Sequence, residues 1–208
     1  VSTYLRNAMG ISAPMAFQGI LMGIAQVVST MIVAPLGNIA IAANTFAITV
    51  ESLCYMPGYG IGEAATTLVG QSIGAGRRNL CRSFAAMSIS SGMVVMALMG
   101  VIMYVFAPEM MGLLTPVADI KANGAAALRI EAFAEPLFAA SIIGYSVCVG
   151  AGDTKVPALM NLFSMWMVRL TLAALLAPNY GLQGVWFAMA CELAFRGLIF
   201  IWRVWKKI

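Results

Sequence analysis

Six apolar stretches, each long enough to cross a lipid bilayer as a helix, constrain this sequence more than any other feature. A helix needs about 20 predominantly apolar residues to span a hydrocarbon core of ~30 Å. Charged residues make up only 10% of the 208 residues and hydrophobic ones 62%, whereas soluble domains carry about 25% charged residues. We therefore predict an all-α integral membrane protein with six transmembrane helices. The expected spans are about 9–33, 40–73, 84–106, 125–149, 156–177 and 184–204.

The second stretch is longer than one straight span requires. It contains Pro57, Gly58, Gly60 and Gly62 near its middle. Proline removes a backbone donor and glycine weakens a helix, so this segment predicts a kinked or tilted helix. No soluble domain and no low-complexity linker interrupts the chain, and we expect residues 1–208 to form a single transmembrane lobe.

Lysine and arginine residues gather at one set of the expected helix ends. If the N-terminus is inside, the outer side carries only Lys121 and Arg129. Cytoplasmic loops of membrane proteins are enriched in these residues, so both termini are predicted to be cytoplasmic. The membrane we expect is a bacterial or archaeal plasma (inner) membrane. The inner residues are Arg6, Arg77, Arg78, Arg82, Lys155, Arg203, Lys206 and Lys207. They form no continuous basic face, which argues against a nucleic-acid partner.

Residues suited to catalysis or metal binding are scarce. There is no histidine, and the four cysteines are far apart without a C-x-x-C motif, so neither a zinc site nor a redox pair is indicated. Gly150-Ala-Gly-Asp153 matches the G-x-G-D motif of aspartyl intramembrane proteases, but those enzymes need a second aspartate inside an apolar helix. The only other aspartate, Asp119, falls in an expected outer loop. We therefore expect neither an enzyme nor a bound cofactor.

Charged residues inside the spans are the best candidates for function. An isolated charge at the bilayer centre costs roughly 2.5–3.5 kcal/mol on insertion scales, so such residues normally pair or line water. Counting from the helix ends at 1.5 Å per residue places three of them in one layer, ~12–15 Å below the outer boundary. These are Glu135, Arg169 and Glu192. Others are Glu51, Glu63, Glu131 and Arg196.

Two pairs among these charges share the i,i+4 spacing of one helix face. Glu192 and Arg196 can form an ion pair directly, whereas Glu131 and Glu135 place two like charges together. We expect Arg169 to relieve that repulsion. Such a network either fixes the register of the helices or lines a water-filled path for substrate or protons, and the sequence leaves both interpretations open.

Three ordered motifs resemble the MATE (multidrug and toxic compound extrusion) family. Residues 57–76 carry A-x-x-x-L-V-G-Q-x-x-G-A-G, residues 150–154 read G-A-G-D-T, and residues 181–186 read G-L-Q-G-V-W. Trp166 and Arg169 match a further W-x-x-R. The resemblance covers nearly the whole chain. Family members have two six-helix lobes around a central cavity, which implies that this chain is one lobe, with the C-terminal lobe favoured.

The resemblance implies a secondary transporter that exports cationic or amphipathic compounds in exchange for H⁺ or Na⁺ by alternating access. Its partners would be the lipid bilayer and an N-terminal six-helix lobe, or a second copy of this chain. Because the sequence begins at Val1 rather than methionine, we expect a piece of a longer protein. A lipid or lipid-linked-sugar flippase of the same superfamily and a non-transporting membrane scaffold remain alternatives.

One departure from the family pattern concerns the coupling ion. The sodium-coupled branch has acidic ligands at positions that align near Met22 and Phe138 here, and neither side chain offers an oxygen. The coupling ion is therefore expected in the absent lobe. Neutral candidates for substrate contact are Gln18, Gln26 and Asn44, to which we add Glu51, Glu135 and Glu192, although the three amides can equally bond neighbouring helices.

Overall fold

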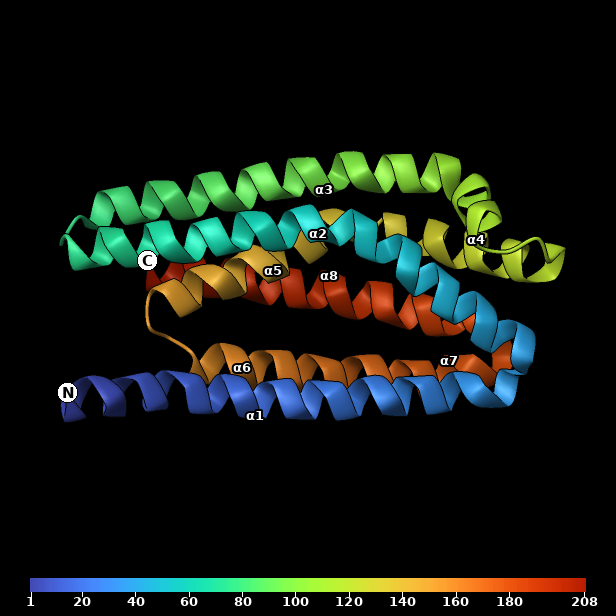
Figure 1. Cartoon of the computed structure of the whole chain (residues 1–208), viewed down its shortest axis with the longest axis horizontal. Helices are drawn as coiled ribbons and strands as arrows, with labels where there is room; N and C mark the ends of the chain where they lie inside the picture. The colour runs from blue at the N-terminus through green and yellow to red at the C-terminus, as the bar shows by residue number, and fades with distance from the viewer.

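A computed structural model describes all 208 residues, nearly all of them in helices joined by short turns (Figure 1). The first three long helices are α1 (Ser2–Val33), α2 (Asn38–Gly74) and α3 (Arg78–Leu114), with the short 3₁₀ helix η1 (Ala34–Leu36) between the first two. They are followed by α4 (Ala118–Ala132), α5 (Glu135–Gly150), α6 (Lys155–Phe163), the π-helix η2 (Ser164–Arg169), α7 (Leu170–Tyr180) and α8 (Leu182–Lys207).

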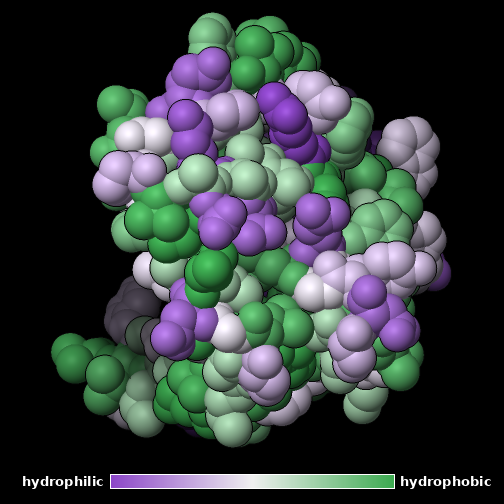
Figure 2. Space-filling model, turned by 90° about the vertical axis from the view of Figure 1, so that its right-hand side faces the viewer, coloured by the Kyte–Doolittle hydropathy of each residue, from purple (hydrophilic) through white to green (hydrophobic).

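Both termini lie at the same end of the molecule. The turns from α2 to α3 and from α5 to α6 share that end, while the α1–α2, α3–α4 and α7–α8 connections lie at the other (Figure 1). Figure 2 looks onto this second end and shows hydrophilic side chains spread among hydrophobic ones. An even number of crossings between the termini is the arrangement that six spans predict.

Five of the expected spans are single runs long and apolar enough to cross a membrane, and the sixth is a bent pair of helices. The expected span 125–149 falls on this pair and is interrupted rather than one unbroken helix. The chain breaks between α4 and α5, whose axes differ by 62°. Pro136 explains the break, because its ring nitrogen has no hydrogen to donate to the carbonyl of Ala132. Gly100 of α3 accommodates the break, since a Cβ there would lie 3.0 Å from the Ala132 carbonyl oxygen.

The span from α6 to α7 is continuous but contains a wider turn. Residues 164–169 form a π-helix between the two α-helical parts. The wider turn changes which residues face the interior, and π-segments of this kind are frequent at functional sites.

The predicted kink segment lies within α2, which stays one helix and changes direction along its length in Figure 1. Two of its glycines serve close packing. Gly58 is buried against Met96 of α3, and a Cβ at Gly62 would lie 2.6 Å from the Ser146 hydroxyl of α5. Gly60 faces open space. Small residues at this spacing allow membrane helices to approach closely.

The helices pack as two unequal groups. The elements α2, α3, α4, α5 and α8 form the larger group, and α1 packs mainly against α6 and α7 along the lower side of Figure 1. In α1 only Ala25 and Val33 are buried. The apolar exterior that this leaves on α1 and α3 suits a lipid environment, where exposed apolar side chains need no cover.

Candidate functional site

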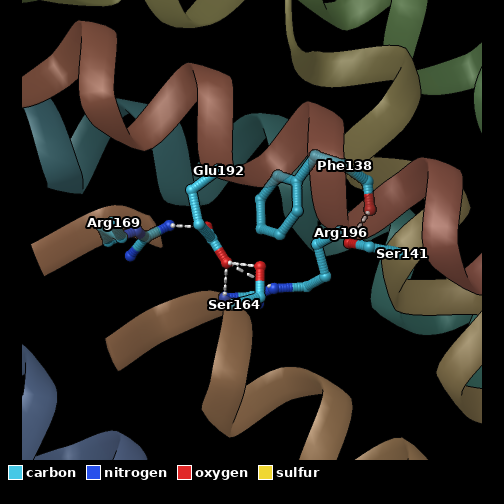
Figure 3. Close-up of polar contacts among 6 residues, drawn as sticks. All are labelled: Phe138, Ser141, Ser164, Arg169, Glu192 and Arg196. Atoms are coloured by element: carbon cyan, nitrogen blue, oxygen red, sulfur yellow. Dashed lines mark hydrogen bonds and ion pairs between the residues drawn. The ribbon is translucent and has the colours of Figure 1, made fainter. Parts of the chain in front are cut away.

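Glu192 of α8 is the centre of a buried network of charges (Figure 3). Its Oε1 accepts hydrogen bonds from Arg196 Nε at 2.8 Å and from the Ser164 hydroxyl at 2.7 Å. Arg196 Nη2 lies 2.5 Å from the same oxygen, and Arg169 Nη2 lies 3.1 Å from Oε2. The Arg169 contact is an ion pair without hydrogen-bond alignment, because Oε2 accepts no hydrogen bond. One carboxylate therefore holds two arginines from two different spans.

The π-helix η2 positions two of these partners. Ser164 begins this segment and Arg169 ends it, and both side chains reach Glu192. The five-residue offset matches one turn of a π-helix more closely than the 3.6 residues of an α-helix. Sequence reasoning found Arg169 and Arg196 but missed Ser164, since nothing in the sequence announces the wider turn that directs it inward.

The direct partner of Arg169 differs from the expected one. We expected Arg169 to relieve the repulsion between Glu131 and Glu135, but its ion pair is with Glu192. Arg169 acts on Glu131, and also on Glu51, only through space by charge attraction. The prediction that Glu192 pairs with Arg196 at i,i+4 is confirmed.

Three other carboxylates meet at the break between α4 and α5. Glu51 comes from α2, Glu131 from the last turn of α4, and Glu135 is the first residue of α5. One oxygen of each lies within 4.8 Å of the others. Glu131 and Glu135 are fully buried, and none of their four oxygens has a hydrogen-bond partner. We call these three residues the acidic triad.

The layer formed by the triad and the Glu192 network carries unequal charge. It contains four glutamates (51, 131, 135 and 192) and two arginines (169 and 196), which leaves two excess negative charges if all are ionised. Like carboxylates in a dry site do not all stay ionised, and an unpaired buried charge is costly. The arrangement is therefore suited to taking up protons or a small hard cation, for which carboxylate oxygens are suitable ligands.

A small pocket next to this layer contains some of the predicted polar candidates. Gln26, Asn44 and Arg169 all line it, together with Trp186. Asn44 Oδ1 accepts a hydrogen bond of 3.0 Å from Trp186 Nε1, so this amide bridges α2 and α8. Gln18 does not line the pocket, and its side-chain oxygen is buried without a partner.

The remaining candidates lie apart from the charged layer or are apolar. Glu63 is exposed. Met22 packs with Met165 and Leu170 in a small apolar cluster, and Phe138 contacts Tyr55 edge to face with ring centroids 5.6 Å apart. Both positions are therefore surrounded by apolar side chains.

Comparisons with known proteins agree with this geometry. The family model described as MatE matches residues 14–175. The chain is 25% identical, over 98% of its length, to the uncharacterized transporter YisQ of Bacillus subtilis (strain 168). It is 28% identical, over 83% of its length, to the probable multidrug resistance protein NorM of Brucella suis biovar 1. It covers 45% and 38% of these two proteins, so the chain spans less than half the length of these curated relatives.

Solved structures match the fold closely. The Vibrio cholerae MATE transporter VcmN in the bent form superposes with a TM-score of 0.93 at 18% identity, covering all of this chain and 47% of VcmN. A MOP superfamily transporter from Pyrococcus furiosus superposes with a TM-score of 0.87 at 14% identity, over 95% of this chain and 44% of its own.

The apolar spans and the charged layer between them define a multi-pass helical membrane protein. Because the family model covers more than half of the chain, this chain belongs to the MatE family. The members of this family are transporters rather than enzymes.

Proposed function

We propose that this chain is one lobe of a multidrug transporter that exports cationic or amphipathic compounds in exchange for H⁺ or Na⁺. The observation that carries the proposal is that the chain matches 38% of the NorM relative from Brucella suis and 47% of the VcmN structure, less than half of each. A transporter as long as these relatives would comprise two such lobes, with substrate carried between them by alternating access. The second lobe would be a separate six-helix segment of the same protein or a second copy.

The acidic triad is our candidate for the coupling-ion site. The sequence directed that site to the absent lobe, because Met22 and Phe138 lack oxygens. The triad offers oxygens from three segments instead, and four of them have no hydrogen-bond partner. Binding a proton or Na⁺ would offset the excess negative charge, and Arg169 connects the triad electrostatically to the Glu192 network. Gln26 and Asn44, at the adjacent pocket, are the candidates for polar substrate contact.

Efflux of a cationic dye tests the proposed activity. A drug-sensitive bacterium should extrude the dye when this chain is expressed together with its natural second lobe, and a protonophore or removal of Na⁺ should abolish the extrusion. Cells that express residues 1–208 alone should retain the dye, because half of the cavity is missing. Gradient-driven efflux by residues 1–208 alone would indicate a working pair of identical lobes, and no efflux by the two-lobe protein would refute the proposal.

The proposed orientation places both termini in the cytoplasm. The end that contains the termini and the turns after α2 and α5 carries eight of the twelve basic residues, as expected of the cytoplasmic side. In a background without cysteines, single cysteines at Asn79 and Lys207 should react with an impermeant reagent only from the inside. A cysteine at Asn179 should react only from the outside. Reaction of Asn79 and Asn179 variants from the same side would contradict the six-span topology.

A further inference from the structure

A basic pocket opens at the end of the molecule that holds both termini. Arg78, at the start of α3, and Lys207, at the end of α8, line it on either side. Its lining includes Cys81 and Cys148, and Asp153 contributes the only side-chain carboxylate. Arg203 already binds that carboxylate, with Nη2 at 2.6 Å and Nε at 3.2 Å from Oδ2. Arg78 and Lys207 form no ion pair, so their two positive charges have no side-chain partner in this chain.

Arg82 connects this pocket to a second, apolar one. Its Nε donates a hydrogen bond to the main-chain oxygen of Ile208, the last residue, and no side-chain carboxylate pairs with it. Ile208 lines both pockets, and Arg82 lines the second. The second pocket is a groove between α3 and α8, lined by apolar and small side chains that include Ala85, Ala86, Ile89, Ile201 and Val204.

Tryptophan residues beside the groove, near the end of α8, indicate that this end of the molecule lies at a membrane interface. Trp205 lines the groove and is 88% exposed, and Trp202 is 59% exposed. Lys206 lies over the Trp202 ring, with Nζ 4.9 Å from its centroid. Tryptophan is enriched where membranes meet water, because its ring is amphipathic. The groove therefore runs from the headgroup level into the hydrocarbon along two lipid-facing helices.

We propose that this pocket and groove bind an anionic phospholipid. The phosphate would lie among Arg78, Arg82 and Lys207, and one acyl chain would fill the groove between α3 and α8. Basic pockets between membrane helices bind anionic headgroups by this charge complementarity. The apolar groove commits the site to a lipid rather than to free phosphate, because phosphate alone leaves the groove empty. This inference goes beyond the proposed function and does not depend on it.

Quenching of tryptophan fluorescence tests the site without any transport assay. The purified two-lobe transporter, stripped of lipid in detergent, is titrated with phosphatidylglycerol or phosphatidylcholine whose acyl chains carry bromine. The difference in quenching between the wild-type protein and a Trp205→Phe variant is the signal that comes from Trp205 in the groove. We expect phosphatidylglycerol to reach half of its maximal quenching at a concentration at least about ten-fold lower than phosphatidylcholine does. Each of Arg78→Gln, Arg82→Gln and Lys207→Gln should reduce this preference about five-fold.

Matched variants separate a built site from general surface charge. Lys155→Gln removes one charge from the same end, outside both pockets, and should leave the preference unchanged. Ala86→Phe should weaken quenching by both lipids, because it fills the groove. Soluble glycerol phosphate should not compete. Equal quenching by the two lipids, or a Lys155→Gln loss as large as that of Arg82→Gln, would overturn the proposal. Melting temperatures of the variants ensure that only folded proteins are compared.

Discussion

Replacing Glu192 with glutamine is expected to destabilise the protein more than neutralising any other charged residue. The carboxylate holds Arg196 and Arg169 in a buried setting, and glutamine leaves both guanidinium groups without their counter-ion. Breaking a buried ion pair by removing one partner costs about 3–5 kcal/mol. For a protein of two such lobes, such a loss lowers the melting temperature by roughly 4 °C. The melting temperature of the two-lobe protein in detergent measures the effect.

The two arginines should not share this loss equally. Arg169 keeps the attraction of Glu51 and Glu131, whereas the only carboxylate within ion-pair distance of Arg196 is Glu192. We therefore expect a second change of Arg196→Gln to recover most of the stability lost in Glu192→Gln, and Arg169→Gln to recover less. Glu63→Gln is the matched control, because it neutralises an exposed glutamate. Equal recovery by the two arginine changes would mean that the triad does not support Arg169.

The pattern of spans was predictable because length and composition determine it. An apolar run of about 20 residues can satisfy its backbone inside a bilayer only as a helix, so the spans followed from the sequence without any tertiary information. The Glu192–Arg196 pair was predictable for a similar reason, since residues four apart on a helix are neighbours. Counting residues also placed Arg169 and Glu192 at one level, and their ion pair agrees with that placement.

The acidic triad was not predictable from depth alone. Counting gives the level of a residue in the membrane but not the direction in which it faces. The break after Ala132 and the packing of α2 decide that Glu51 meets Glu131 and Glu135. The apolar run over 125–149 hides that break, and only Pro136 signals it. The π-turn at 164–169 redirects Arg169 in the same way, towards Glu192.

Neutralising a member of the acidic triad is expected to abolish transport while leaving the fold intact. Glu131→Gln removes one of three clustered carboxylates and strands no partner, because its oxygens bond nothing in the structure. The amide can instead donate a hydrogen bond to Glu51 or Glu135, which removes a repulsion and gains a contact. The melting temperature should therefore stay the same or rise. This outcome is the opposite of that expected for Glu192→Gln.

Dye efflux by the same variant should fall at least ten-fold, because the proposed coupling site loses the charge that a proton or Na⁺ would neutralise. Glu51→Gln and Glu135→Gln should behave alike, while Glu63→Gln, an exposed glutamate on the same helix as Glu51, should transport normally. A Glu131→Gln protein that melts as early as Glu192→Gln, yet exports dye normally per folded molecule, would assign the triad a structural role.

The identity of the coupling ion follows from a stability measurement on the same proteins. An ion that binds only the folded state raises the melting temperature. At concentrations above its dissociation constant, the rise grows with the logarithm of the ion concentration. If Na⁺ is the ion, replacing choline by Na⁺ at constant ionic strength should stabilise the wild-type protein. The three triad variants should lose that stabilisation, and Glu63→Gln should keep it. If the ion is H⁺, Na⁺ should leave all five proteins unchanged and a proton gradient alone should drive efflux. Stabilisation by Na⁺ that persists in Glu51→Gln, Glu131→Gln and Glu135→Gln would place the ion elsewhere in the transporter.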